Sequence, residues 1–214
     1  MPTVYGVIAS PFVRKVRVVL AEKGIQYDLE PVMPMGVSAE YRKISPLGKV
    51  PAYRDGDFTL ADSSVICAYL ERVQPSPALY PSGAQDFARA LWFEEYGDSG
   101  LVSVIGPKIF MQKIVRPMFL GQPTEEDVVK KAVEEELPPM FDYLESQLGG
   151  GAYIVGDQLT IGDIGLATQF VNLKEAGFGV DAGRWPKLAK YVEGIHARPS
   201  FSACIEEEKQ MFPS

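Results

Sequence analysis

Apolar and polar positions change their spacing along the first 75 residues in the order expected of a small mixed α/β domain. Thr3 to Ala9 is rich in β-forming residues, and Pro11 to Lys23 places apolar residues on one helical face before Gly24 ends the helix. Tyr27 to Val32 returns to an extended pattern. These segments predict a β-α-β unit of about thirty residues.

A hairpin and a further helix complete this predicted domain. The turn sequence Asp55-Gly56-Asp57 separates two short runs with strand spacing. Asp62 or Ser63 is expected to cap the helix that follows. The predicted elements are a helix over Ala39 to Ile44, strands over Ala52 to Arg54 and Phe58 to Leu60, and a helix that runs toward Gln74.

The remainder of the chain has helical spacing throughout. Gln74 to Gly83 is rich in Pro, Ser and Gly, which is typical of a linker. Helices are predicted over Ala84 to Val115, Thr124 to Leu148, Thr160 to Glu175, Trp185 to Ala197 and Ser200 to Lys209. Pro138 and Pro139 are expected to kink or break the second of these. The sequence therefore predicts an α/β domain at 1–75, a linker at 76–84 and an all-helical domain at 85–214.

Composition and charge exclude several classes of function. Of the 214 residues, 46% are hydrophobic and 23% charged, as in ordinary globular proteins. The formal charge of -7 argues against a nucleic-acid partner, because neutralising phosphates needs clustered Lys and Arg. The sequence has neither a basic leader followed by an apolar segment nor an apolar run of about 18 residues. We therefore expect a cytoplasmic protein with no membrane association.

The sequence offers little for metal or disulfide chemistry. Cys67 and Cys204 are the only cysteines and His196 is the only histidine. Without a Cys-x-x-Cys pair or a histidine cluster, we expect no metal site and no disulfide framework. Cys67 lies in an apolar helical stretch and is interpreted as a buried core residue.

Ser10 is the first candidate for chemistry. It lies where the first predicted strand ends and the first predicted helix begins, the edge at which open α/β sheets bind ligands. Pro11 directly after it favours the first helical position, so Ser10 is also a natural N-cap that would satisfy a backbone N–H. From position alone, the structural role of a cap is favoured over the chemical one.

Five motifs in register resemble the cytosolic glutathione transferase family, in its serine-type classes such as tau, phi and related bacterial ones. They are Ser10-Pro11-Phe12-Val13-Arg14-Lys15-Val16, Ser45-Pro46-Leu47-Gly48-Lys49-Val50-Pro51, Ala61-Asp62-Ser63-Ser64, Gly156 to Asp163, and Arg198-Pro199-Ser200-Phe201. Together they span nearly the whole chain. The resemblance implies a thioredoxin-like N-terminal domain that binds glutathione, followed by an all-helical domain that contributes the electrophile site.

The resemblance also assigns roles to individual positions. It implies that Ser10 stabilises the glutathione thiolate, that Val50 and a cis Pro51 bind the cysteinyl backbone, and that Asp62 and Ser63 bind the γ-glutamyl end. The N-terminus of a helix offers N–H groups and a positive dipole to a carboxylate, which suits Ser63. The resemblance places Phe12 at the electrophile site. Lys49 is interpreted either as a contact to the glycyl carboxylate or as an exposed, solvated lysine.

The expected activity is transfer of glutathione to hydrophobic electrophilic small molecules in detoxification, or use of its thiol to reduce organic hydroperoxides. Glutathione would serve as the substrate and no metal would be needed. Relatives are mostly homodimers, so a homodimer is expected. The alternative is a non-catalytic member of this fold that acts as an interaction or regulatory module, because fold alone does not fix function.

Thr160 and Asp163 have the spacing of a capping box and are assigned to folding.

Overall fold

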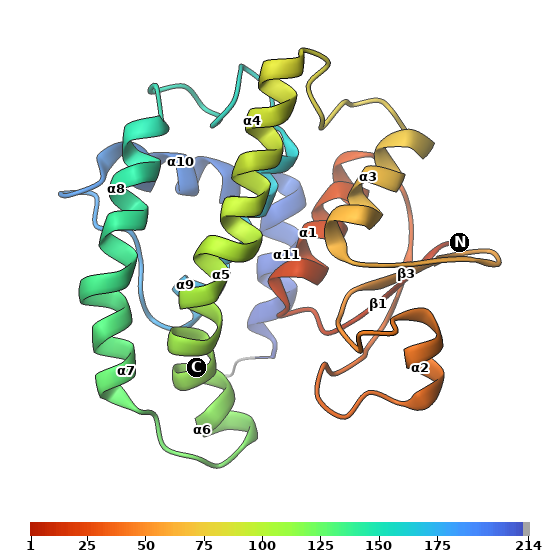
Figure 1. Ribbon diagram of the computed structural model, residues 1–214, viewed down its shortest axis with the longest axis horizontal. Coiled ribbons are helices and arrows are strands. Elements are labelled where there is room, and N and C mark those ends of the chain that lie inside the picture. The colour runs from red at the N-terminus through yellow and green to blue at the C-terminus, as the bar shows by residue number, and fades with distance from the viewer. Residues whose placement is uncertain (212–214) are drawn as a thin grey trace. The chain divides into compact units, whose positions relative to one another are not determined.

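The computed structural model describes residues 1–211 and divides into two compact units (Figure 1). Unit 1 contains Met1–Tyr80 together with the last helix of the chain, and unit 2 contains Pro81–Ala197. Unit 1 holds all the strands of the described residues, and the regular elements of unit 2 are helical. The last three positions of the predicted 85–214 domain lie outside the described residues.

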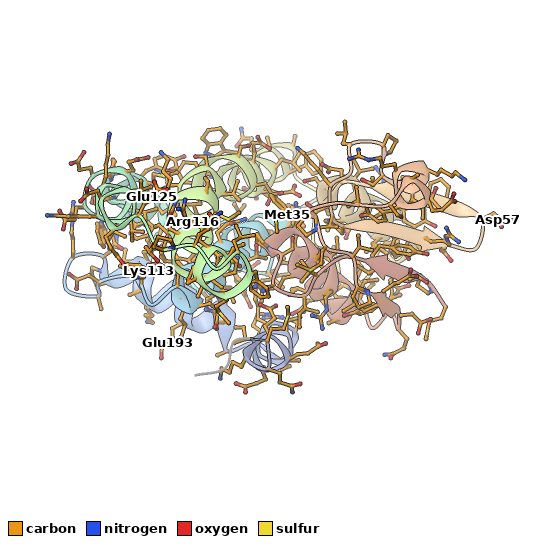
Figure 2. The ribbon with its side chains drawn as sticks, turned by 90° about the horizontal axis from the view of Figure 1, so that it is seen from below. Met35, Asp57, Lys113, Arg116, Glu125 and Glu193 are labelled. Atoms are coloured by element: carbon orange, nitrogen blue, oxygen red, sulfur yellow. The ribbon has the colours of Figure 1, made fainter. Side chains whose placement is uncertain are left out.

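A four-stranded mixed sheet forms the centre of unit 1. Its strands are β1 (Thr3–Tyr5), β2 (Asp28–Glu30), β3 (Ala52–Asp55) and β4 (Phe58–Ala61), in the spatial order β2-β1-β3-β4. β1 and β2 run parallel, and the other two pairs are antiparallel. Asp57 lies at the tip of the β3–β4 hairpin (Figure 2). The predicted β-α-β unit and hairpin are confirmed.

Helix α1 (Pro11–Glu22) is the central helix of unit 1, whose other helices are α2 (Ala39–Ile44), α3 (Ser63–Val73) and α11 (Pro199–Lys209). Its residues Val13, Val16 and Leu20 are fully buried, and α1 packs against both α3 and α11. Cys67 is likewise fully buried in α3, which confirms its interpretation as a core residue.

Helix α11 is bound to α1 by ion pairs, although the two helices lie at opposite ends of the chain (Figure 1). Arg14 donates from two nitrogens to the Glu208 carboxylate, and both side chains are almost completely buried. Arg17 pairs with Glu207, and Arg198 pairs with Glu22. The sequence analysis places α11 in the predicted helical domain at 85–214, whereas in the structure α11 packs within unit 1. The domain boundaries themselves stay a prediction.

Unit 2 is a bundle whose long helical stretches include π-helical turns. The first stretch contains α4 (Ala84–Glu95), η1 (Tyr96–Leu101), α5 (Val102–Val104), η2 (Ile105–Val115) and α6 (Arg116–Phe119). The others contain α7 (Glu126–Lys131), η3 (Ala132–Glu136), α8 (Leu137–Gln147), α9 (Ile161–Glu175) and α10 (Pro186–His196). Pro138 lies in the first turn of α8, where a missing N–H costs little. The predicted interruption therefore takes the form of a π-helical turn followed by a new α-helical start.

Two glycines allow α9 to approach α4 and η1 closely. A Cβ atom on Gly97 would lie 2.4 Å from the Gly165 carbonyl oxygen, and one on Gly162 would lie 2.8 Å from the Ala90 carbonyl oxygen. Such distances are too short for any larger residue. The backbones of these helices are therefore in direct contact at the crossing.

Asp163 is the centre of a buried hydrogen-bond network at the start of α9. Its carboxylate accepts hydrogen bonds from the Ile154 and Thr160 N–H groups, each at 2.8 Å, from the Thr160 hydroxyl at 2.9 Å and from the Tyr191 hydroxyl at 2.8 Å. The predicted capping box is thus present. Asp163 also joins α9 to α10 and to the preceding loop, which a cap alone would not do.

Candidate functional site

The last residues of β1 and β4 and the first residue of β3 lie at the same edge of the sheet. Tyr5 of β1 pairs with Ala52 of β3, and Ala52 pairs with Ala61 of β4. The residues next to these partners are Gly6, Pro51 and Asp62, so the register brings them side by side. The chain continues from Gly6 toward Ser10 and α1. The sheet therefore gathers Ser10, Val50, Pro51, Asp62 and Ser63 around one edge.

Gly6 shows how tightly this edge is packed. It has a φ of +154°, and a Cβ atom there would lie 2.4 Å from Val13 Cγ2 and 3.3 Å from Val50 Cβ. Val50 therefore lies against the β1–α1 connection. The predicted strand Thr3 to Ala9 ends early, at Tyr5, because Gly6 and the Ser10 N–H bond to the Val7 carbonyl (3.0 Å) turn the backbone toward α1.

Ser10 is the N-cap of α1, as its position predicts. Its half-buried hydroxyl oxygen accepts a hydrogen bond from the Val13 N–H, but the separation is 3.5 Å. Typical N–H···O bonds are about 2.7–3.2 Å long, so this cap bond is weak. A serine hydroxyl can accept such a bond and still donate its proton elsewhere.

The segment before β3 is fixed by hydrogen bonds to one carbonyl group. The Lys49 carbonyl accepts from the Tyr41 hydroxyl at 2.9 Å and from the Ser45 hydroxyl at 2.8 Å. Burial raises the pKa of Tyr41, and the hydrogen bond with Ser45 opposes that change. The Val50–Pro51 peptide is cis, as the resemblance implies. The Lys49 side chain is exposed, and the structure leaves both of its interpretations open.

Asp62, rather than Ser63, is the N-cap of α3. Its Oδ1 atom accepts hydrogen bonds from the Ser64 N–H at 3.0 Å and the Val65 N–H at 3.2 Å. Asp62 has a φ of +82°, which costs a non-glycine residue about 1–3 kcal/mol and is common at binding sites. Ser63 is the first helical residue and is 4% exposed. Its hydroxyl is thus not needed as the cap.

Lys15 is a residue of this edge to which sequence reasoning gave no role. The lysine is completely buried, and its ammonium donates a hydrogen bond to the Ser64 hydroxyl at 2.8 Å. It therefore links α1 to the first turn of α3. The sequence feature that could have indicated its burial is its position between Val13 and Val16 on the apolar side of α1. The pattern alone, however, does not distinguish a buried lysine from one whose ammonium reaches solvent.

The remaining candidate groups are Phe12, Cys204 and His196. Phe12 is half-buried at the start of α1. Cys204 is buried, which raises the pKa of its thiol, and the His196 ring lies 2.9 Å from the Ala167 carbonyl oxygen. Among residues 1–211, the structure has no group of three His, Cys, Asp or Glu side chains that could bind a metal ion. No helix in the same range has the length and apolar character needed to cross a membrane.

Comparison with known proteins identifies the family. The family model "Glutathione S-transferase, N-terminal domain" matches residues 4–78, and "Glutathione S-transferase, C-terminal domain" matches residues 110–208. Glutathione S-transferase 3 of Zea mays is 30% identical over 208 residues, covering 94% of this chain and 91% of the maize protein. The chain belongs to the glutathione S-transferase family. The expected fold, a thioredoxin-like domain followed by helices, is confirmed by this membership.

Solved structures of glutathione S-transferases agree with this assignment. A glutathione S-transferase from Rhodospirillum rubrum F11 superposes with a TM-score of 0.86 at 25% identity, covering 95% of this chain and 91% of that one. A glutathione transferase homologue from Drosophila mojavensis, solved with bound glutathione, has a TM-score of 0.78 at 29% identity, with coverages of 96% and 93%. The similarity thus extends over both units of the chain.

Proposed function

We propose that the protein binds glutathione at the sheet edge of unit 1 and transfers its sulfur to an electrophilic carbon of a hydrophobic small molecule. The observation that carries the proposal is the register, which brings the ends of β1 and β4 beside the start of β3. It gathers a serine at a helix N-terminus, a cis-proline turn and a second helix N-terminus around one edge. Membership of the glutathione S-transferase family supports glutathione as the thiol substrate.

Ser10 stabilises the thiolate in this proposal. A free thiol has a pKa near about 8.5, so lowering it by about two units requires roughly 2.7 kcal/mol of preferential stabilisation of the anion. A charge-assisted hydrogen bond from Ser10 and the positive end of α1 supply interactions of this size. The weak bond to Val13 leaves the Ser10 hydroxyl free to reorient toward sulfur.

The other residues of the edge bind the rest of the peptide. The Val50 backbone pairs with the cysteinyl backbone of glutathione, next to the cis peptide at Pro51. Ser63 donates to the γ-glutamyl carboxylate, and Asp62 accepts from its ammonium. Lys49, whose side chain is exposed, contacts the glycyl carboxylate, and Phe12 contacts the electrophile.

The proposed transfer needs neither a metal ion nor a redox partner, because every proton and electron pair in it is accounted for by the two substrates and solvent. The thiol proton leaves to solvent when the thiolate forms at Ser10. The thiolate then attacks the electrophilic carbon and forms a carbon–sulfur bond. Either a leaving group departs with the bonding electrons, or an activated alkene takes up a proton at its adjacent carbon.

A second copy of this chain is the proposed partner. Phe58 on β4 and Val65 and Val73 on α3, all in unit 1, are about half exposed. Exposed apolar side chains of this kind are found at association surfaces. Sedimentation of the protein should give a dimer, and Phe58→Ser should shift it toward the monomer.

A cytoplasmic location is also proposed, and cell fractionation tests it.

Titration with glutathione and its S-hexyl conjugate tests the function. Both ligands should raise the melting temperature in a saturable manner, because ligands that bind the native state stabilise it. Conjugation to a chloronitrobenzene electrophile and reduction of an organic hydroperoxide should then be assayed. Binding without either activity, or no binding at all, would move the assignment to a non-catalytic interaction module.

A further inference from the structure

The first turn of α3 is poorly suited to bind a carboxylate unaided. Two of its N–H donors, those of Ser64 and Val65, already bond to Asp62 Oδ1. The Asp62 carboxylate also lies at the place where the ligand carboxylate should bind. Like charges at one site repel, so the dipole of α3 alone does not favour a second anion there.

Lys15 brings a positive charge to the same turn. Its ammonium donates to the Ser64 hydroxyl at 2.8 Å, one residue after Ser63. It is completely shielded from solvent, so its charge acts through a medium that screens it weakly. The Lys15 ammonium should therefore attract the ligand carboxylate more strongly than the ammonium of a surface lysine would.

We propose that Lys15 is a positioning residue for the γ-glutamyl carboxylate of glutathione. Its ammonium fixes Ser64 in the first turn of α3 and offsets the negative charge of Asp62, so that Ser63 can receive the ligand carboxylate. This inference rests on the proposed function. It adds a residue on α1, the helix that Ser10 caps, to the recognition of the opposite end of the peptide.

Lys23, the C-cap residue of the same helix, is a matched control. It is also a buried lysine, and its ammonium bonds to the Gln74 carbonyl at 2.7 Å, the Pro77 carbonyl at 2.9 Å and the Glu71 carboxylate at 2.7 Å. It follows the last turn of α1, whereas Ser10 precedes the first. Lys23→Met removes the same chemistry without touching the proposed ligand contacts.

The test measures two ligands against two variants by isothermal titration. The ligands are glutathione and 4-aminobutyryl-cysteinylglycine, which lacks only the γ-glutamyl α-carboxylate. We expect Lys15→Met to weaken glutathione binding about fivefold to thirtyfold and to change binding of the decarboxylated analogue less than about twofold. Lys23→Met should lower the melting temperature and leave the ratio of the two affinities unchanged. With saturating glutathione, kcat of Lys15→Met should stay within about threefold of wild type.

Other outcomes overturn the inference in distinguishable ways. If Lys15→Met weakens both ligands equally, or neither, the lysine is structural and the proposed function still holds. If wild type binds neither ligand, the proposed function itself fails. Should Lys15→Met not fold, Ser64→Ala gives the same comparison, with an expected loss of about threefold for glutathione only. An unchanged ratio in Ser64→Ala would then reject the role of Lys15.

Discussion

At the scale of single residues, Ser10 combines two roles that one hydroxyl group can fill together. Its oxygen accepts the Val13 N–H, and its hydrogen is available to a ligand atom. The two interpretations of this serine, as a helix cap and as the activating group, are therefore compatible. They still predict different effects when the hydroxyl is removed.

Ser10→Ala should raise the pKa of bound glutathione and reduce kcat near neutral pH, while glutathione affinity changes less. Losing one donor to a developing anion costs about 2–4 kcal/mol, a fall of tens to several hundredfold. Ultraviolet titration of the thiolate in the binary complex measures the pKa, and Ser10→Thr, which keeps the hydroxyl, is the control. Equal thiol pKa values in wild type and Ser10→Ala would leave Ser10 as a cap only.

Ser63→Ala should weaken glutathione binding more than it slows turnover, because Ser63 is assigned to the end of the peptide away from the sulfur. A lost charge-assisted hydrogen bond costs about 1.5–3 kcal/mol. Since Asp62 is the N-cap, the variant should keep its melting temperature. Ser202→Ala, in the first turns of α11, is the control. An unaltered dissociation constant in folded Ser63→Ala contradicts the assignment.

At the scale of elements, α9 depends on two kinds of contact that its own sequence only partly reveals. Every residue from Ile161 to Leu173 is buried. Its N-terminal part is held by the Asp163 network and by the backbone contact of Gly162 and Gly165 with α4 and η1. Each contact gives a separate stability prediction.

Asp163→Ala should destabilise the protein by about 3 kcal/mol or more, which exceeds the roughly 0.5–2 kcal/mol expected for a capping residue. The reason is that four donors lose their acceptor in a buried place. Urea unfolding measures the free energy, and Asp163→Asn should lose less because an oxygen is retained. If the folded variant lost activity instead of stability, Asp163 would be functional.

Gly97→Ala should destabilise unit 2 by about 1–3 kcal/mol, because its Cβ would overlap the Gly165 carbonyl. Gly106→Ala is the matched control in the same helical stretch. A Cβ on Gly106 would meet only Val102 Cγ2, at 3.6 Å, an ordinary contact. That variant should gain up to about 1 kcal/mol from helix propensity. Urea midpoints moving in the same direction for both variants would contradict the close-packing argument.

At the scale of the whole molecule, the pairing of Glu22 with Arg198 and Ser200 makes the free energy of unfolding depend on pH. Burial alone would raise the pKa of Glu22, but the hydrogen bonds from Arg198 and Ser200 outweigh it and lower the pKa below 4.5. A lowered folded-state pKa means that the stabilisation is complete above the unfolded pKa. It is lost as pH falls through the folded pKa.

Glu22→Gln should therefore cost about 1 kcal/mol at pH 7 and progressively less as the pH falls below about 4. Urea unfolding of both proteins across this range checks the sign. Glu206→Gln is the control, because the Glu206 pair with Lys209 is exposed to solvent, and it should change stability little at any pH. If the loss of stability in Glu22→Gln stays constant as the pH falls and Glu22 of the wild type is protonated, the ion pair is not its source.

Local signals made much of this fold and its candidate site predictable. The Asp55-Gly56-Asp57 turn, the Ser10-Pro11 helix start and the Thr160-to-Asp163 box act over a few residues, so the sequence displays them directly. The burial of Lys15 and the packing of α11 on α1 depend on residues far apart in the chain. Arg14 and Glu208 are 194 positions apart, and no periodicity connects them.

The Arg14–Glu208 pair also has a consequence for synthesis on the ribosome. Translation makes α1 early, but the carboxylate that compensates the buried Arg14 guanidinium follows 194 positions later. The native surroundings of α1 include α11, so they are incomplete in a nascent chain that has only passed Tyr80. Unit 1 must therefore finish folding after unit 2 has left the exit tunnel, and a fragment ending at Tyr80 should remain bound to chaperones.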